Sequence, residues 1–233
     1  EPPSDVVLRN KLLQYRALLP DYDVIVLSDY ATGSLVSVSE MIMAARAENK
    51  IVMVDPKGDD FTRYTGATVL TPNKGELKRI VGSWNSEEQL TTKAQNLRES
   101  LLLSALLLTR SEEGMTLYTA NERFHFPAAA REVFDVSGAG DTVIATMAAM
   151  LGAGASWPDA VGMANRLWVM ITAVIIALGV MLGASGLSPE VAPFIDLAAA
   201  SGAGPSSILG IGLRTQPAMA ALAGSANAAA QTT

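Results

Sequence analysis

The chain of 233 residues contains no cysteine and a single histidine, His125. The absence of cysteine excludes disulfides, iron–sulfur clusters and zinc–thiolate sites, and it is typical of a reducing compartment. We therefore expect a cytoplasmic protein. A single histidine also excludes a histidine-rich metal site and argues against a Ser-His-Asp triad. Because residues 123–126 alternate like a strand, His125 is expected to be a structural or surface residue.

Positive charge is scarce relative to negative charge. Lysine and arginine total 17 against 23 aspartates and glutamates, which gives a formal net charge of −6. Such a chain has no basic field to attract nucleic acid or anionic lipid, so we expect no nucleic-acid partner. Its length is sufficient for one large domain or two small ones.

Short apolar runs that alternate with helical patterns predict an α/β fold with a mostly parallel sheet. In such sheets ligands bind beyond the carboxyl ends of the strands. Residues 86–89 fit a capping box. Strands are expected at 23–27, 51–54, 67–70 and 103–108, a hairpin at 115–119 and 123–126, and helices at 39–47, 73–81 and 86–99. Polar residues that follow three strands are expected to converge on one rim: Asp55 and Lys57, Asn73 and Glu76, and Thr109 to Ser111.

The most informative motif is Asp-Val-Ser-Gly-Ala-Gly-Asp at residues 135–141, followed by an apolar run. Small residues allow a tight turn, and the first amides of a following helix can hold phosphate oxygens. An acid there would repel an anion unless it accepts a proton from an attacking hydroxyl. The motif therefore predicts a phosphotransferase with Asp141 as general base. The alternative is an ordinary turn with Asp141 as a first-turn acid.

With these motifs in place, the chain resembles the ribokinase-like (PfkB) carbohydrate kinases over about residues 21–165. Within that family it is most similar to the kinase domain of the bifunctional heptose 7-phosphate kinase/heptose 1-phosphate adenylyltransferases. The resemblance implies a three-layer α/β sandwich in which the N-terminal part of the family domain has no counterpart. The matching stretches are Leu-Ser-Asp-Tyr-Ala at 27–31, Asp-Pro-Lys-Gly at 55–58 with residues 60–61 and 63–64, Leu-Thr-Pro-Asn at 70–73 with Glu76, Thr-Arg-Ser-Glu at 109–112 with Gly114 and Met115, and the glycine motif through Thr142.

The resemblance also implies roles for single residues. Asp141 would take the proton of the sugar's anomeric hydroxyl. Asn73 and Glu76 would organise Mg²⁺ through water, since this ion prefers oxygen ligands. On the residues alone, a helix cap at Asn73 and an exposed first-turn acid at Glu76 are an equally good interpretation. The other implied positions are Gly138, Ala139 and Gly140 for an anion hole, Asn73, Thr109, Arg110, Gly114 and Asn165 for the nucleotide, and Asp135 and Lys57 for the phosphates or a monovalent cation.

The implied reaction is phosphoryl transfer from MgATP to O1 of D-glycero-D-manno-heptose 7-phosphate, which yields the 1,7-bisphosphate for ADP-heptose and lipopolysaccharide-core biosynthesis. The partners are then ATP and a sugar phosphate, and the full-length parent is expected to be a homodimer. Two alternatives stay open. One is a catalytically inactive ATP-binding fragment, and the other is a ribokinase-like kinase for another sugar.

The character of the chain changes after Asn165. Residues 1–166 are predicted to be the C-terminal portion of the kinase domain, and the Ala/Gly/Ser-rich residues 190–233 to be disordered. Residues 167–189 carry no charge up to Pro189 and allow three interpretations: a degraded kinase helix, a frame-shifted segment or a membrane span. Little positive charge flanks the run, which disfavours the membrane.

Overall fold

The computed structural model describes residues 3–128 and 139–167. In these residues six strands form one sheet in the order β1-β2-β3-β4-β5-β6. Strands β1 to β4 run parallel, and β5 and β6 add an antiparallel hairpin. The strands are β1 (Val24–Ser28), β2 (Ile51–Asp55), β3 (Val69–Leu70), β4 (Ala105–Thr109), β5 (Met115–Thr119) and β6 (Arg123–Phe126).

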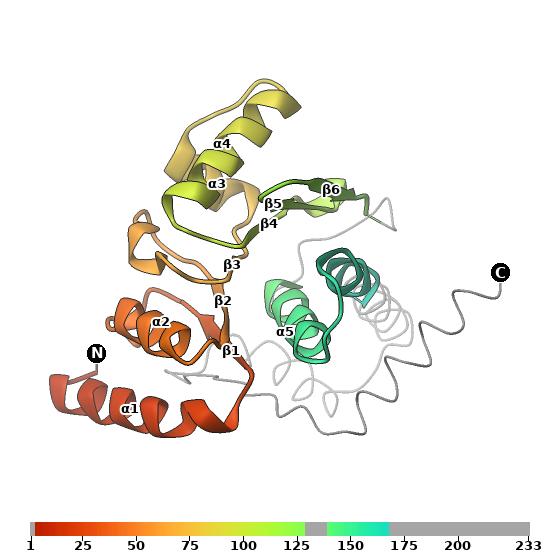
Figure 1. Ribbon diagram of the computed structural model, residues 1–233. Helices are drawn as coiled ribbons and strands as arrows, with labels where there is room; N and C mark the ends of the chain where they lie inside the picture. Colours follow the sequence, from red (N-terminus) through yellow and green to blue (C-terminus); the bar gives the residue numbers. More distant parts are fainter. Residues whose placement is uncertain (1–2, 129–138, 168–233) are drawn as a thin grey trace, which may run out of the picture.

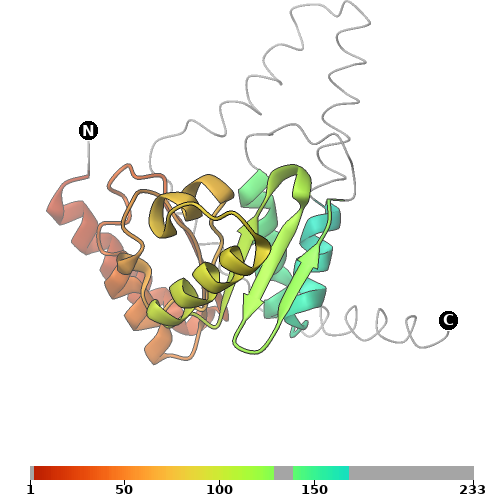
Figure 2. The same ribbon diagram turned by 90° about the horizontal axis from the view of Figure 1, so that it is seen from above.

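Helices cover both faces of this sheet, which makes three layers (Figures 1 and 2). One face carries α1 (Asp5–Leu18), α2 (Val38–Ala47), α3 (Lys74–Val81) and α4 (Glu87–Ser100). The other carries α5 (Ala139–Gly152) and a helix over residues 157–167. Three short 3-10 helices complete the connections: η1 (Leu19–Asp21), η2 (Thr62–Tyr64) and η3 (Ser111–Glu113).

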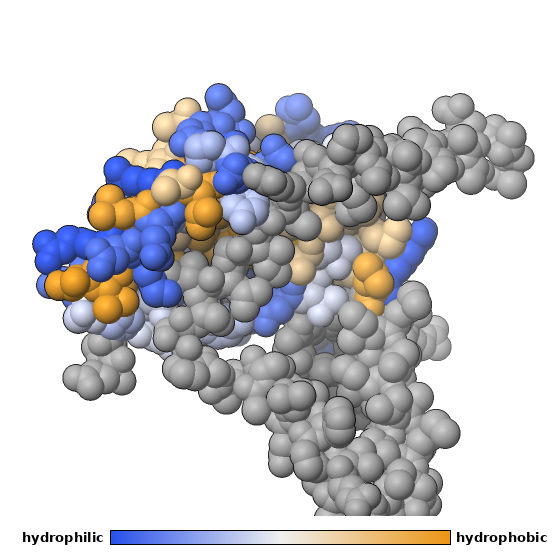
Figure 3. All heavy atoms as spheres, turned by 90° about the horizontal axis from the view of Figure 1, so that it is seen from below, coloured by the Kyte–Doolittle hydropathy of each residue, from blue (hydrophilic) through white to orange (hydrophobic). Residues whose placement is uncertain are grey.

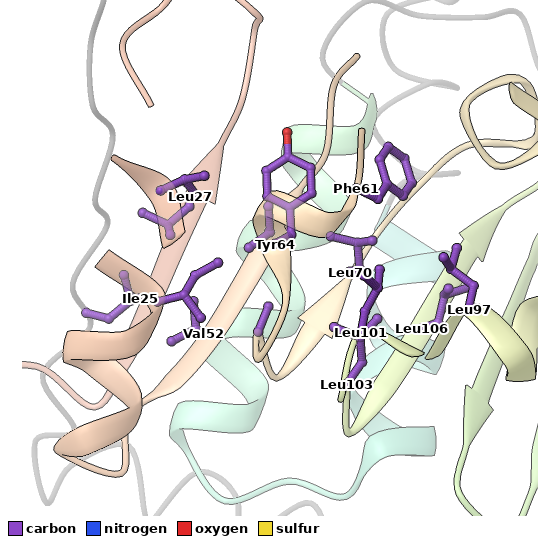
Figure 4. Packing of buried hydrophobic residues seen from close by; sticks show 14 of the residues in the cluster. Ile25, Leu27, Val52, Phe61, Tyr64, Leu70, Leu97, Leu101, Leu103 and Leu106 are labelled. Carbon is purple, nitrogen blue, oxygen red and sulfur yellow. The ribbon is translucent and has the colours of Figure 1, made fainter. Parts of the chain in front are cut away.

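Alternate residues of the strands enter two separate cores, because successive side chains of a strand point to opposite faces. On β1, Ile25 and Leu27 pack toward the α1–α4 side, whereas Val24 and Val26 pack toward α5. Figure 4 shows the first core, where Leu70 and Leu106 from neighbouring strands meet the residues of η2 and α4. The second core is closed by Val143, Ile144, Met147, Ala148 and Leu151 of α5 with Ala160, Val161 and Ala164.

Helix α1 differs from the other α-helices of the described residues because it buries none of its residues. Leu12 and Tyr15 pack against the first core, and Tyr15 donates a hydrogen bond to the carbonyl of Met41 on α2 at 3.0 Å. Figure 3 shows apolar patches among hydrophilic ones on the side of the molecule where α1 lies. The exposed apolar residues of this helix are Val6, Val7, Leu13 and Leu18.

The predicted α/β fold is confirmed, and each predicted strand is found, although β3 is shorter than expected. Two helices were not predicted, α1 and the one at 157–167. The expected capping box at Ser86 is only half formed. Ser86 accepts from the Gln89 amide at 3.2 Å, but the Gln89 side chain accepts from Asn85 instead of Ser86.

Within residues 3–128 and 139–167, no helix combines the length and the apolar character that crossing a bilayer requires. The uncharged run is outside the described residues except for Leu167, and the tail at 190–233 is entirely outside them.

Candidate active site

The carboxyl ends of β1 and β2 place the first elements of the site side by side. The two strands are parallel and in register, so Ser28 pairs with Asp55 at their ends. Helix α5 starts next to this edge, because a Cβ atom added to Gly140 would lie 4.0 Å from Oδ2 of Asp55. The first turn of α5, which carries Asp141, therefore faces the end of the parallel strands.

Asp141 is held by two hydroxyl groups, one from Ser28 at the end of β1 and one from Tyr30 just after it. The Tyr30 hydroxyl lies 3.2 Å from Oδ1 and 3.1 Å from Oδ2 of Asp141, and the Ser28 hydroxyl lies 3.4 Å from Oδ1. Tyr30 is 56% exposed, so this side of the carboxylate opens to solvent. The carboxylate is thus oriented by protein donors while it stays accessible to a small molecule.

Asn73 and Glu76 form a complete capping box at the start of α3. The Glu76 amide donates to Oδ1 of Asn73 at 2.9 Å, and the Asn73 amide donates to Oε2 of Glu76 at 3.0 Å. The other carboxylate oxygen of Glu76 accepts from Nζ of Lys57 at 2.8 Å. The cap interpretation of Asn73 is therefore confirmed, but the expectation of an exposed Glu76 is wrong, because this residue is only 3% exposed.

Arg110 lies past the end of β4, where acidic side chains of α4 and η3 hold it. Its guanidinium pairs with Glu87 at the start of α4 and with Glu113 in η3, each at 2.5 Å, and the residue is only 7% exposed. Glu113 also pairs with Lys74 at 2.6 Å. Burial of the guanidinium requires such partners, because an unpaired buried charge is costly. A role at the nucleotide phosphates stays a prediction for Arg110.

The remaining predicted nucleotide positions lie along the same side of the sheet. Thr109 donates its amide to the carbonyl of Pro72 at 3.0 Å and forms an isolated bridge with Asn73, so these two lie together. Asn165 is 6% exposed, and its Nδ2 donates to the carbonyl of Pro127 at 3.0 Å. Its Oδ1 is buried with no hydrogen-bond partner among the described residues. Asp135, Gly138 and the side chain of Ala139 lie outside the described residues.

Three carboxylates, those of Asp55, Glu76 and Asp141, lie near one another at this rim. Burial raises the pKa of Asp55 to about 7, and the negative charges of Glu76 and Asp141 add to the rise. Lys57 and Thr71 oppose it. In the part of the chain that the structure describes, no three acidic or histidine side chains are arranged to hold a metal ion directly. Glu76 already accepts two protein hydrogen bonds, but its carboxylate has lone pairs left. These lone pairs can accept from water molecules bound to Mg²⁺, so the site fits the ion only through water.

The raised pKa of Asp55 predicts a pH-dependent stability. A carboxyl group whose pKa rises from 3.8 to about 7 on folding contributes stability that is complete below about pH 3.8 and is lost progressively as the pH rises to about 7. Asp55→Asn is therefore expected to raise the free energy of unfolding by about 1–3 kcal/mol at pH 8 and by less at pH 5. Urea titrations at both pH values measure the difference. Asp59→Asn, which removes an exposed carboxylate, is the control, and an equal gain at both pH values for Asp55→Asn would contradict the prediction.

Sequence reasoning missed the part that three residues play in this site. Ser28, Tyr30 and Asp55 stand out in the sequence only as parts of matching stretches or polar clusters, yet they contact or influence Asp141. Their position just beyond strand ends was the available signal, since ligands of parallel sheets bind there.

Comparison with known proteins agrees with this geometry. A family model described as pfkB family carbohydrate kinase matches residues 5–171. The bifunctional protein HldE of Shewanella amazonensis is 51% identical over 186 residues, which cover 79% of this chain and 36% of that protein. The D-beta-D-heptose 7-phosphate kinase of Bordetella bronchiseptica is 55% identical over 148 residues, which cover 64% of this chain and 47% of that protein. The chain thus spans between about a third and a half of these curated relatives.

The fold is also found among solved structures. Ribokinase of Arabidopsis thaliana, solved with ribose and ATP, superposes with a TM-score of 0.59 at 21% identity, and the match covers 74% of this chain and 54% of that one. At this identity the likeness concerns the fold, which is ribokinase-like. Because the family model covers well over half of the sequence, the chain belongs to the pfkB family of carbohydrate kinases.

Proposed function

We propose that this chain is the nucleotide-side and catalytic portion of an ATP-dependent heptose 7-phosphate kinase. The observation that carries the proposal is the place of Asp141, in the first turn of α5 at the carboxyl edge of the parallel strands, with its carboxylate held by Tyr30 and Ser28. The choice of sugar is supported by the names of two relatives that are 51% and 55% identical to the chain over the aligned residues.

In the proposed reaction, Asp141 accepts the proton of the O1 hydroxyl of D-glycero-D-manno-heptose 7-phosphate. The bond from O1 to the γ-phosphorus of ATP forms while the bond from that phosphorus to the β–γ bridging oxygen breaks. ADP and the 1,7-bisphosphate leave. The amides at the start of α5 face the transferring group, and with Gly138, Ala139 and Gly140 they form the proposed anion hole. Most of the catalysis is then positioning and charge stabilisation.

The proposal includes ions. Glu76 and Asn73 would hold Mg²⁺ through water, and the ion would neutralise charge on the ATP phosphates. Lys57 lies close enough to these residues to meet a phosphate, although it pairs with Glu76 in the structure. A monovalent cation near Asp135, a cytoplasmic location and a homodimer of the full-length parent rest on the family resemblance alone.

Two other functions compete with this one. A ribokinase-like kinase for another sugar would use the same base and the same nucleotide edge. A catalytically inactive ATP-binding fragment would keep the nucleotide edge of the sheet but would not phosphorylate a sugar. No observation on the described residues favours either alternative over heptose phosphorylation.

A substrate panel tests the proposal. The chain is incubated with MgATP alone and with heptose 7-phosphate, ribose, fructose or fructose 6-phosphate, and ADP release is measured. We expect release that depends on heptose 7-phosphate and exceeds that with the other sugars at least about tenfold, since a missing hydrogen-bonded group typically costs that much or more. Preference for another sugar would overturn the substrate, and MgATP binding without sugar-dependent release would support the inactive fragment.

A further inference from the structure

A buried tyrosine–aspartate pair lies directly behind the site. Asp29 follows β1 and is only 4% exposed. Its Oδ1 accepts the Ala31 amide at 2.8 Å, and its Oδ2 accepts the hydroxyl of Tyr64 at 2.7 Å. Arg63 adds a longer ionic contact, 3.6 Å from Oδ2. These contacts fix the backbone on both sides of Tyr30, the residue that holds Asp141.

The same tyrosine hydroxyl also fixes the loop after β2. It accepts a hydrogen bond from the Lys57 amide at 3.1 Å and lies 3.0 Å from the Lys57 carbonyl. Burial raises the pKa of Tyr64, so its hydroxyl keeps the proton that Asp29 accepts. One oxygen atom therefore touches both loops, and the side chain of Lys57 on the second loop pairs with Glu76.

Tyr64 is itself firmly supported. The residue is fully buried, and its ring meets the edge of Phe61 at a centroid distance of 5.8 Å. Figure 4 shows its hydroxyl directed away from the surrounding leucines and valines. The carbonyl of the preceding residue, Arg63, accepts the hydroxyl of Ser39 on α2 at 2.7 Å, and its guanidinium donates to the carbonyl of Leu35, just before α2, at 2.5 Å. Packing around the ring and hydrogen bonds of the neighbouring residue thus hold the Tyr64 hydroxyl in place.

We propose that Tyr64 and Asp29 are positioning residues of the catalytic rim: they lock the loop that carries Tyr30 to the loop that carries Lys57. Neither touches the carboxylate of Asp141. They act by keeping the partner of Asp141 and the partner of Glu76 at a fixed separation. This inference rests on the proposed function for its catalytic consequence, but the mechanical link between the loops exists independently of it.

Amide hydrogen exchange on the full chain tests the link without any need for activity. In Tyr64→Phe the ring stays and only the hydroxyl is lost. We expect exchange to become at least about fivefold faster at the Lys57 amide and also at the Ala31 amide, which Tyr64 does not contact directly. In Asp29→Asn we expect faster exchange at the Ala31 amide, which Asp29 contacts, and also at the Lys57 amide, which Tyr64 contacts. If each variant alters only the loop that it contacts, the lock is disproved.

Tyr118→Phe is the matched control. Tyr118 is fully buried in the same core, but no hydrogen bond joins its hydroxyl to the loop after β1 or to the loop after β2. Its loss should leave exchange at Ala31 and Lys57 unchanged. An equal acceleration in this control would show general loosening of the core and would overturn the proposal.

A kinetic arm tests the consequence for catalysis. We expect Tyr64→Phe to lower kcat about tenfold, because a small misplacement of catalytic groups is costly, with a KM for MgATP within about twofold of that of the unaltered chain. Added to Tyr30→Phe, the same change should cost less than about twofold more, because its effect passes through Tyr30. Full additivity would overturn the positioning role. A chain without sugar-dependent turnover would instead refute the proposed function. The hydrogen-exchange experiment would still test whether Tyr64 and Asp29 link the two loops.

Discussion

Replacement of Asp141 by asparagine is expected to lower sugar-dependent ADP release by about 10²–10⁴-fold, the usual contribution of a positioned general base. Asparagine has nearly the same shape, and its Oδ1 can still accept from Tyr30 and Ser28, which lie 3.2 and 3.4 Å from that atom. It cannot accept the O1 proton. The loss should therefore appear in kcat, with little change in thermal stability. Coupled-enzyme detection of ADP with saturating MgATP and heptose 7-phosphate measures it.

Asp159→Asn is the control for this experiment. Asp159 is also an acid in the first turn of a helix, where it accepts the Ser156 hydroxyl at 2.6 Å, but it is exposed and lies outside the candidate site. Its loss should leave turnover nearly unchanged. If Asp141→Asn retained most of the activity, Asp141 would be only a first-turn acid, and the general base would have to be sought elsewhere.

Substitution of Gly114 by alanine is expected to destabilise the protein by more than about 3 kcal/mol. Gly114 ends η3 with φ 87° and ψ −131°, a conformation that only glycine adopts without strain. A Cβ atom there would lie 2.0 Å from the carbonyl oxygen of Phe126 and 2.6 Å from the amide nitrogen of Ala128. Both neighbours are backbone atoms, so the hairpin of β5 and β6 would have to shift. Such overpacking together with backbone strain is among the few causes of large single-residue effects.

Gly154→Ala separates strain from collision. Gly154 has a similar φ of 83°, but an added Cβ would meet nothing within 4 Å. It should therefore cost only about 1–2 kcal/mol. Urea unfolding followed by tryptophan fluorescence gives both values. Equal losses of unfolding free energy in the two variants would show that the close approach of the Phe126 backbone has no energetic consequence. The packing explanation for Gly114 would then be wrong.

The strands were predictable because buried strands consist of uninterrupted apolar runs. Residues 105–108 form such a run, and all four are completely buried. Helix α1 was missed although Leu8, Leu12 and Tyr15 recur in its sequence at helical spacing. The helix follows two prolines and buries none of its residues, so this apolar stripe is weaker evidence than the fully buried strands give. Its place depends on contacts such as that of Tyr15 with α2, which local sequence does not reveal.

The site was predictable where its residues stand shortly after the end of a predicted strand. Lys57 and Glu76 were expected on one rim, and they meet at 2.8 Å. Arg110 shows the limit of this reasoning. Its partner Glu87 lies 23 residues away at the start of another helix, so the place of the guanidinium does not follow from the strand end alone. Pairing of charges across elements depends on tertiary packing, whereas the position of a residue after a strand does not.

The two-sided sheet has a consequence for the growing chain. Strands β1 to β6 leave the ribosome before α5, so the apolar residues that face α5, including Val24, Val26, Met53 and Leu107, have no cover until residues 143–164 have been synthesised. An uncovered sheet face of this kind invites association with other chains. Helix α5 therefore ends a vulnerable stage of biosynthesis. Since the same helix carries Asp141, a nascent chain that lacks the proposed general base also has one face of its sheet uncovered.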